Sequence, residues 1–234
     1  MTNTTLRAYL DELKLLLEQE ALEEVMGHCR HILQHFPKNV ETYRILGRAL
    51  LEKNRHQEAG DVFERVLSAV PDDFVSHLGL SAVSEAVGQI PRAIWHLERA
   101  HEQEPNNTAL RDELKRLYER QDGAAPERLQ MTLGGLAYTY YRSKLYEQAV
   151  TELKHALDQM PDRGDLLVLL ANAYWDTERP VEAAETALQL LGILPNSLQG
   201  NRIVAAVWLK AGRPSDAAPF VSRLEQLDPY LAWQ

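Results

Sequence analysis

Apolar residues recur along this chain with the spacing of amphipathic helices, and the whole pattern repeats. In the stretch 130–163, Leu136 and Ala137 fall on the apolar face of one predicted helix, and Ala149 and Leu153 fall on the apolar face of the next. Two such helices bury these faces when they pack against each other in opposite directions. The stretch therefore predicts a helix hairpin.

The hairpin recurs at a constant interval. Six prolines close equivalent stretches, and they stand 34, 34, 56, 34 and 34 residues apart: Pro37, Pro71, Pro105, Pro161, Pro195 and Pro229. The long interval of 56 equals one interval of 34 plus 22 extra residues. A repeat of this length indicates stacked helix hairpins, in which each unit buries its apolar face on its neighbours.

Small residues and capping residues mark fixed positions of the repeat. Counted from the start of each 34-residue unit, position 8 holds Gly47, Ser81, Ala137, Ala171 and Ala205, and position 20 holds Ala59, Ala93, Ala149, Ala183 and Ala217. Small side chains at both positions allow the paired helices to approach closely. Helix-capping residues follow several of the prolines, namely Asn39, Asp73, Asn107 and Ser197. Their side-chain oxygens can accept hydrogen bonds from free amides at the start of the next helix.

This pattern resembles the tetratricopeptide repeat, and the resemblance covers nearly the whole chain. It implies an all-α fold, a right-handed superhelical solenoid of antiparallel helix hairpins with six repeats plus one extra helix, about 13 helices. The unit 6–39 is the poorest copy, with Glu12 at the usual leucine position and Val25 at the usual alanine position. Terminal repeats are expected to be atypical, because one face meets water.

The 22 extra residues predict how the chain is divided. Leu110, Leu114 and Leu117 recur at helical spacing, which predicts an amphipathic helix that caps the repeats before it. We therefore expect an N-terminal three-repeat module over 1–121 with its capping helix at 108–121, a linker at 122–125, and a C-terminal three-repeat module over 126–234. Pro126 suits the first position of the next helix. The sequence leaves open whether the two modules form one continuous superhelix or bend at the linker.

The C-terminal end of the repeat array has no predicted cap. No further helix follows Pro229, so an apolar repeat face between Val207 and Trp233 is expected to need covering. This observation supports an alternative function, in which the chain is an oligomerising, structural or regulatory domain of a larger protein. A homo-oligomer formed through this face is one form of that alternative.

The resemblance also implies where a partner binds. In such repeats the first helix of each unit lines a concave surface, with positions 2, 5, 9 and 12 facing the groove. The predicted groove residues are Tyr138, Tyr141, Asn172, Trp175 and Arg202 in the second module, and Arg44 and Arg48 in the first. Aromatic rings interleaved with amide and guanidinium groups suit a peptide groove. Two alternatives stay open: the aromatic rings pack between neighbouring first helices, and the arginines belong to a solvated charged face.

Charge and cysteine content indicate which partners and which cellular compartment are to be expected. The formal net charge is −9, and the sequence contains no run of lysine and arginine, so we expect no nucleic-acid partner. Cys29 is the only cysteine, which excludes an intrachain disulfide and favours a reducing compartment. Acidic residues occupy the N-terminal stretch where a secretory signal has an apolar run, and no segment is long and apolar enough for a membrane span. We therefore expect a cytoplasmic protein that does not enter a membrane.

Nothing in the sequence predicts catalysis. Phosphate-binding, zinc-protease and nucleophile-elbow motifs are all lacking, so we expect no enzyme and no cofactor. His28, His31 and His35 share one helix face, but they are predicted to point outward, so a surface cluster is favoured over a metal site. The expected function is a non-enzymatic protein–protein interaction scaffold or adaptor that binds an extended peptide or helix of a partner in its groove.

Two adjacent glycines interrupt the apolar pattern inside a predicted helix. Gly134 and Gly135 each cost about 1 kcal/mol relative to alanine in a helix. They predict either a close helix contact or room for the backbone of a ligand, and close packing is favoured.

Overall fold

The computed structural model describes residues 5–230, and over that range it contains thirteen α-helices and no strands. The first half of the chain contains α1 (Leu6–Glu18), α2 (Leu22–His35), α3 (Val40–Glu52), α4 (His56–Ala69), α5 (Phe74–Ala86), α6 (Ile90–Gln103) and α7 (Thr108–Asp122). The second half contains α8 (Leu133–Arg142), α9 (Tyr146–Gln159), α10 (Gly164–Asp176), α11 (Pro180–Ile193), α12 (Leu198–Lys210) and α13 (Pro214–Leu227). The predicted all-α solenoid of helix hairpins is confirmed.

The first helix of most units begins at a side-chain cap, as predicted. Asn39 Oδ1 accepts from the amide of Thr42 at 2.9 Å, and Asp73 Oδ1 accepts from the amide of Ser76 at 2.8 Å. Second helices have no side-chain cap, and α6, α11 and α13 begin with proline in their first turn. Proline costs little there because the first amides of a helix have no partner within the helix.

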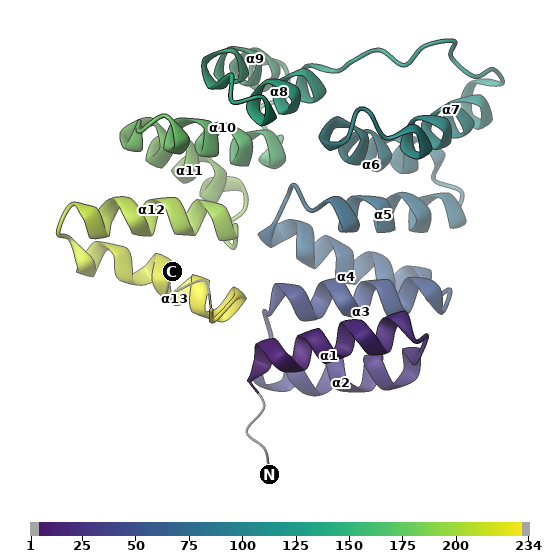
Figure 1. Cartoon of the computed structure of the whole chain (residues 1–234), viewed down its shortest axis with the longest axis horizontal. Coiled ribbons are helices and arrows are strands. Elements are labelled where there is room, and N and C mark those ends of the chain that lie inside the picture. The colour runs from purple at the N-terminus through teal and green to yellow at the C-terminus, as the bar shows by residue number, and fades with distance from the viewer. Residues whose placement is uncertain (1–4, 231–234) are drawn as a thin grey trace.

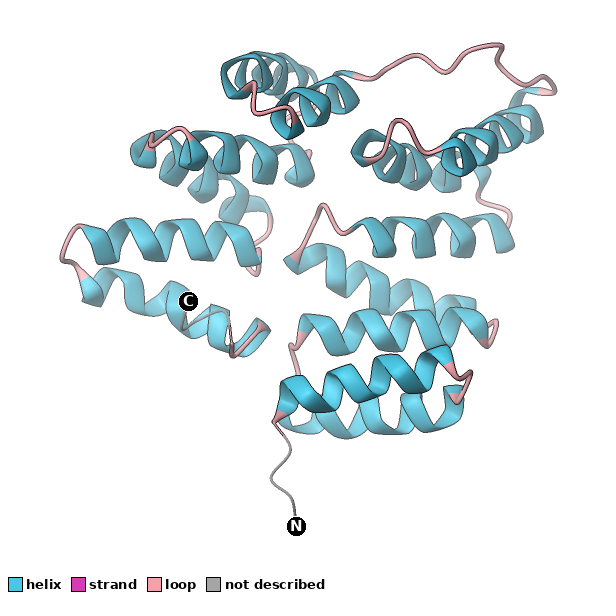
Figure 2. Ribbon diagram, viewed as in Figure 1, coloured by secondary structure: helices cyan, strands magenta, loops and turns pink. Residues whose placement is uncertain are grey.

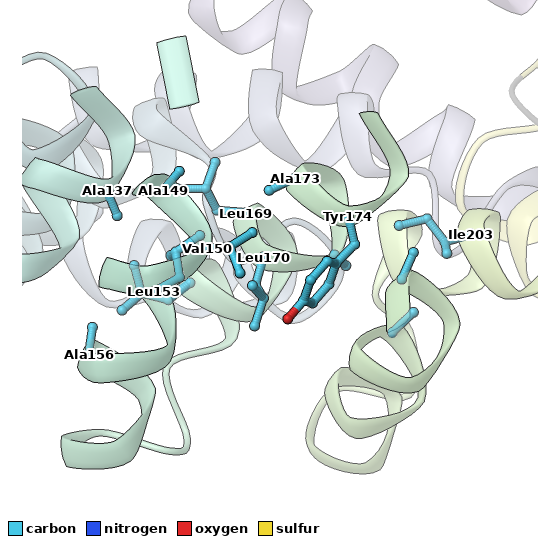
Figure 3. Packing of buried hydrophobic residues seen from close by; sticks show 14 of the residues in the cluster. Ala137, Ala149, Val150, Leu153, Ala156, Leu169, Leu170, Ala173, Tyr174 and Ile203 are labelled. Atoms are coloured by element: carbon cyan, nitrogen blue, oxygen red, sulfur yellow. The ribbon is translucent and has the colours of Figure 1, made fainter. Parts of the chain in front are cut away.

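Small residues allow the close packing inside the hairpins. Phe63 is fully buried, and its ring lies against both Gly47 and Gly79. A Cβ atom added at Gly47 would lie 2.6 Å from the Phe63 ring, so only glycine fits there without a shift. In the second half, Ala137 and Ala149 line the same kind of contact, seen in close-up in Figure 3.

The helices form two columns that lie side by side (Figure 1). One column contains α1 to α7 and the other α8 to α13, and the loops between successive units face each other across the middle (Figure 2). Val40, Val66 and Ala69 of the first half pack with Leu227 of the second. The side-chain amide of Asn39 also donates to the carbonyl of Leu227 at 3.5 Å. We call the whole set of contacts between the two halves, of which this cluster is one part, the seam. It shows that the chain bends between its halves.

The connection between the columns is longer than predicted. The helix predicted over 108–121 is present as α7, and the non-helical segment after it runs over 123–132 and not over 122–125. Pro126 lies inside this segment, so the prediction that it begins the next helix is wrong. The next helix begins at its cap, where Thr132 Oγ1 accepts from the amide of Gly135 at 3.0 Å. The division into two modules as units of folding stays a prediction.

The end of the last helix is covered by the chain itself. Leu227 is 3% exposed in the seam, and the Tyr230 hydroxyl accepts from the backbone amide of Arg7 at 3.3 Å. Trp233, which the sequence places on the predicted uncapped face, lies outside the described residues. Leu227 of the predicted face therefore packs within the chain, whereas Leu209 of the same face is 52% exposed, and the homo-oligomer stays a prediction. None of the helices within 5–230 has the length and apolar content needed to cross a bilayer.

Candidate functional site

The first helices of the second half, α8, α10 and α12, neighbour one another and bring predicted groove residues together. Tyr141 at the end of α8 donates from its hydroxyl to Asp176 Oδ2 on α10 at 2.6 Å. Its ring meets the ring of Tyr146 edge-on at 5.5 Å. Burial and the bond to Asp176 both raise the pKa of Tyr141, whereas the nearby charge of Arg202 on α12 lowers it. Tyr141 is therefore a neutral hydroxyl at neutral pH.

The same surface continues over α10 and α12. Lys210 Nζ lies 4.5 Å from the centre of the Trp175 ring, within range of a cation–π contact. Gln199 donates from its side-chain amide to Asn172 Oδ1. Trp175 and Asn172 are both partly exposed, while Lys210 is exposed. We call Tyr141, Asn172, Trp175 and Arg202, with their neighbours Gln199 and Lys210, the second-half surface.

The aromatic residues of this surface also have a structural role. Tyr141 and Trp175 pack against the apolar core of the second half while remaining partly exposed. The alternative that these rings pack between neighbouring helices is thus correct in part, since both residues contact the core and both keep part of their surface exposed.

Tyr138 differs from the other predicted groove residues of the second half because its side chain is buried. Its side chain is 7% exposed and belongs to the core cluster of the second half. The charges of Asp165, Asp72 and Glu102 lie close enough to raise its pKa further, after burial as the main cause. The expectation that Tyr138 lines an open groove is therefore wrong, because its side chain packs into the core of the second half.

Arg44 and Arg48, the two predicted groove arginines of the first half, differ in their ion pairs and their exposure. Arg44 donates to Asp73 Oδ2 through Nη2 at 2.6 Å and is also paired with Glu41. Lys14 binds the same Glu41 at 2.8 Å. Arg48 is exposed. Arg44 is therefore occupied by carboxylates of its own chain, and Arg48 alone is presented to solvent.

A buried ion network crosses the seam, and the sequence reasoning missed it. Arg163 at the start of α10 donates through Nη2 to Glu102 Oε2 on α6 at 2.7 Å and grips Asp165 with two bonds of 2.8 and 2.6 Å. Arg99 donates two bonds to Glu102, at 2.9 and 2.8 Å, and Thr132 donates to Glu102 Oε1 at 2.6 Å. Glu102 is 2% exposed. The pKa of Arg163 is raised because Asp165 and Glu102 together outweigh its burial.

Gly134 makes room for this network, and Gly135 lies beside it. A Cβ atom added at Gly134 would lie 2.8 Å from the carboxylate of Glu102, and one added at Gly135 would lie 3.7 Å from the Cα atom of Glu102. The prediction that these glycines serve close packing is confirmed. They were the one signal in the sequence that pointed to this part of the seam.

A cleft of about 880 Å³ lies next to the network, under the segment 123–132. Its walls come from α6, α7, that segment and the start of α8. Leu114, Leu129 and Met131 supply apolar lining, and charged residues of both signs stand around it. This mixed lining indicates no single chemical class of ligand.

Comparison with known families decides the classification. The tetratricopeptide repeat description matches residues 16–82 and 140–207, more than half of the chain. The chain belongs to the tetratricopeptide repeat family. Both matched stretches lie within regions where the closing prolines keep their constant interval.

Solved structures with the same kind of repeat are similar to this tetratricopeptide repeat chain. MamA is 23% identical, the match covers 80% of this chain and 96% of MamA, and the TM-score is 0.38. YrrB, described as a tetratricopeptide repeat protein with an unusual peptide-binding site, is 19% identical over 82% of this chain and 88% of its own, with a TM-score of 0.46. The APC/C hetero-tetramer Cut9–Hcn1 is 16% identical over 99% of this chain and 48% of its own, with a TM-score of 0.44.

These TM-scores all lie below 0.5, so the family assignment rests on the repeat match. No curated protein sequence matches the chain.

The histidines of the first tetratricopeptide repeat do not gather around a common point. His31 and His35 pack edge-on at 5.1 Å, and His28 bonds to the hydroxyl of Tyr9. Within residues 5–230, no three or more His, Cys, Asp or Glu side chains are placed to hold a metal ion. Cys29 is fully buried, and burial raises its thiol pKa to about 12, so it packs as an apolar side chain.

Proposed function

We propose that this tetratricopeptide repeat protein is a non-enzymatic interaction scaffold that binds an extended segment of a partner protein on its second-half surface. The observation that supports the proposal is the gathering of Tyr141, Trp175 and Arg202 on three neighbouring first helices. Both rings pack against the core and remain partly exposed, and Tyr141 is also held by its hydrogen bond to Asp176. A ring held in this way loses little conformational freedom when it binds a partner.

The polar groups of the surface suit a peptide backbone. Asn172 and Gln199 carry amide groups that can exchange their mutual hydrogen bond for bonds to backbone carbonyl and amide groups of a bound segment. Arg202 and Lys210 have no carboxylate partner among residues 5–230, in contrast to Arg44 and Arg163. Among the predicted groove residues, Arg202 of the second half and Arg48 of the first therefore have side chains that can donate to a bound segment.

A protein partner is favoured over a nucleic acid. The chain carries a formal charge of −9, and many of its arginines are bound by its own carboxylates. Phosphate backbones are bound by clusters of free cations, which the second-half surface does not supply in number. The reduced, buried state of Cys29 suits the cytoplasm, where we place the protein.

The test is partner capture from a native cell extract with Tyr141→Ala combined with Trp175→Ala. We expect the double variant to lose captured partners that the unmodified chain retains, with unchanged helical circular dichroism. The matched control is Tyr43→Ala with Trp95→Ala, which removes one partly exposed tyrosine and one exposed tryptophan of the first half. Equal capture by both double variants and the unmodified chain would contradict the proposal.

A further inference from the structure

Glu102 is held in a site that the second half builds. Glu102 itself belongs to α6 of the first half, yet two of its hydrogen-bond donors, Thr132 and Arg163, come from the second. Thr132 donates to one carboxylate oxygen at 2.6 Å and Arg163 to the other at 2.7 Å. The only other donor to the carboxylate in the described chain is Arg99, from its own helix. Residues outside its own helix therefore contact both oxygens of the Glu102 carboxylate, as a binding site contacts a ligand.

The backbone of α8 is shaped for this carboxylate. A Cβ atom added at Gly134 would lie 2.8 Å from the carboxylate of Glu102, so a side chain at this position would displace the carboxylate. Glycine at this helical position is costly, and the close approach offsets that cost. We call Thr132, Gly134 and Arg163 the carboxylate cradle. Thr132 and Arg163 donate to different oxygens of the carboxylate, and glycine at position 134 leaves the space that the carboxylate occupies.

The cradle lies where the groove of the second half is closed. Tyr138 and Asp165 stand at groove positions of α8 and α10, and both are buried here, at 7% and 6% exposure. The charge of Glu102 acts on Tyr138, and Arg163 links Glu102 to Asp165. The first half therefore covers the part of the groove that adjoins the exposed second-half surface.

We infer that Glu102 is an internal ligand of the carboxylate cradle, and that a protein partner binds by inserting an acidic side chain in place of Glu102. This inference rests on the proposed function, because the partner is the segment that also contacts the second-half surface. The partner's acidic residue would be gripped by Arg163 and Thr132 as Glu102 is now. Displacement opens the seam and extends the groove to Tyr138 and Asp165.

The seam is built in a way that permits opening. The hydroxyl of Tyr138 and Nη1 of Arg163 are buried without a hydrogen-bond partner among the described residues. Each such group weakens the closed state. The seam also contains a small apolar cluster around Val66 and Leu227. The contacts of the ion network are polar, and polar interfaces between the halves of a chain permit relative motion.

The first experiment asks whether the cradle binds a free carboxylate. Glu102→Ala empties it, and sodium acetate is then compared with sodium chloride at equal concentration. We expect acetate to raise the melting temperature of Glu102→Ala by about 3 °C or more over chloride, in a saturable way. In Glu102→Ala with Gly134→Ala the added methyl group fills the cradle, so the acetate effect should vanish. An equal response of both variants overturns the inference.

The second experiment asks what displaces Glu102. A random dodecapeptide library on phage is selected against the full chain carrying Glu102→Ala. We expect enriched sequences to share a fixed Asp or Glu, and their affinity to fall at least tenfold when Gly134→Ala is added. If Glu102→Ala does not fold in either salt, Glu102→Gln, which keeps the side-chain volume, replaces it in the selection.

The outcomes separate this inference from the proposed function. Peptides that lose affinity with Tyr141→Ala and Trp175→Ala but not with Gly134→Ala support the second-half surface and overturn the cradle as a partner site. Neutral or basic enriched peptides, or no enrichment, also overturn it. Light scattering on the unmodified chain supplies a further check. A concentration-dependent dimer that Glu102→Ala abolishes makes a second copy the occupant and overturns the inference as well.

Discussion

Glu102 and Arg163 are 61 positions apart in the chain, and their side chains meet at 2.7 Å across the seam. Both side chains are almost fully buried, at 2% and 7% exposure. Buried ion pairs add little net stability relative to apolar packing, but removal of one partner leaves an uncompensated charge. The pair therefore links α6 to the start of α10 while the seam is closed, and in this arrangement Tyr138 and Asp165 are buried.

The first prediction concerns this pair. Glu102→Ala and Arg163→Ala should each lower the free energy of unfolding by about 3–5 kcal/mol, because each leaves the buried network of Arg99, Glu102, Arg163 and Asp165 with one charge in excess. The double variant should lose less than the sum of the two. Urea unfolding followed by circular dichroism measures all three.

The control for the pair is Glu64→Ala, which breaks an exposed ion pair with Arg92. Its effect should stay within about 1 kcal/mol. A comparably small effect of Glu102→Ala would mean that the seam does not form in solution.

The second prediction concerns pH. Burial raises the pKa of Asp72 from 3.8 to about 6, and the charges of Asp165 and Asp73 add to this, while Arg44 opposes it. The folded state thus binds the proton more tightly than the unfolded state, so this group makes the protein more stable as pH falls from about 6 toward 4. Asp72→Asn should raise the melting temperature at pH 7.5, and this gain should shrink by pH 5.

Melting temperatures at pH 5, 6 and 7.5 check the second prediction. The control is Asp61→Asn, an exposed carboxylate on α4. A gain for Asp72→Asn that is the same at all three pH values would show that its carboxyl group does not titrate in this window.

The third prediction concerns helix packing. Gly47→Ala places a Cβ atom 2.6 Å from the ring of Phe63, so it should destabilise the protein by about 1–3 kcal/mol. Gly27→Ala is the matched control, because this glycine is also helical but meets nothing within 4 Å. It should stabilise the protein by up to about 1 kcal/mol. Thermal unfolding compares the two, and effects of the same sign would contradict the packing described here.

The fourth prediction tests the seam by cross-linking. A Cβ atom at Gly164 would lie 3.4 Å from Cβ of Pro71, close to the range found in disulfides. Pro71→Cys with Gly164→Cys, in a Cys29→Ala background, should therefore form a disulfide under mild oxidation and unfold at a higher temperature when oxidised. The side chain of Leu194 must shift to admit the new sulfur, since its Cδ1 lies 2.8 Å from that Cβ position.

Mass spectrometry and non-reducing electrophoresis detect this cross-link. The control pair is Pro71→Cys with Gly192→Cys, since Gly192 is exposed and has no neighbour within 4 Å of an added Cβ. Equal oxidation of both pairs would indicate that the halves do not hold the described seam.

The sequence predicted the positions of some residues of the candidate site and misplaced one of them. The repeat register placed Tyr141, Asn172, Trp175 and Arg202 on first helices, and the structure brings them to one surface because neighbouring units stack in register. Their role in binding stays a prediction. Tyr138 occupies an equivalent position yet is buried, because its ring packs into the core of the second half and Glu102 and Asp72 of the first half lie nearby.

The amino-acid sequence by itself determined the helices, their pairing and their stacking. These depend on contacts between residues near in sequence: caps such as Asn39, small residues such as Ala149, and prolines at a constant interval. The tertiary structure alone decided how the two columns meet. The pairing of Glu102 with Arg163 and of Asn39 with Leu227 depends on the path of segment 123–132 and on the fit of two distant surfaces, which no local pattern encodes.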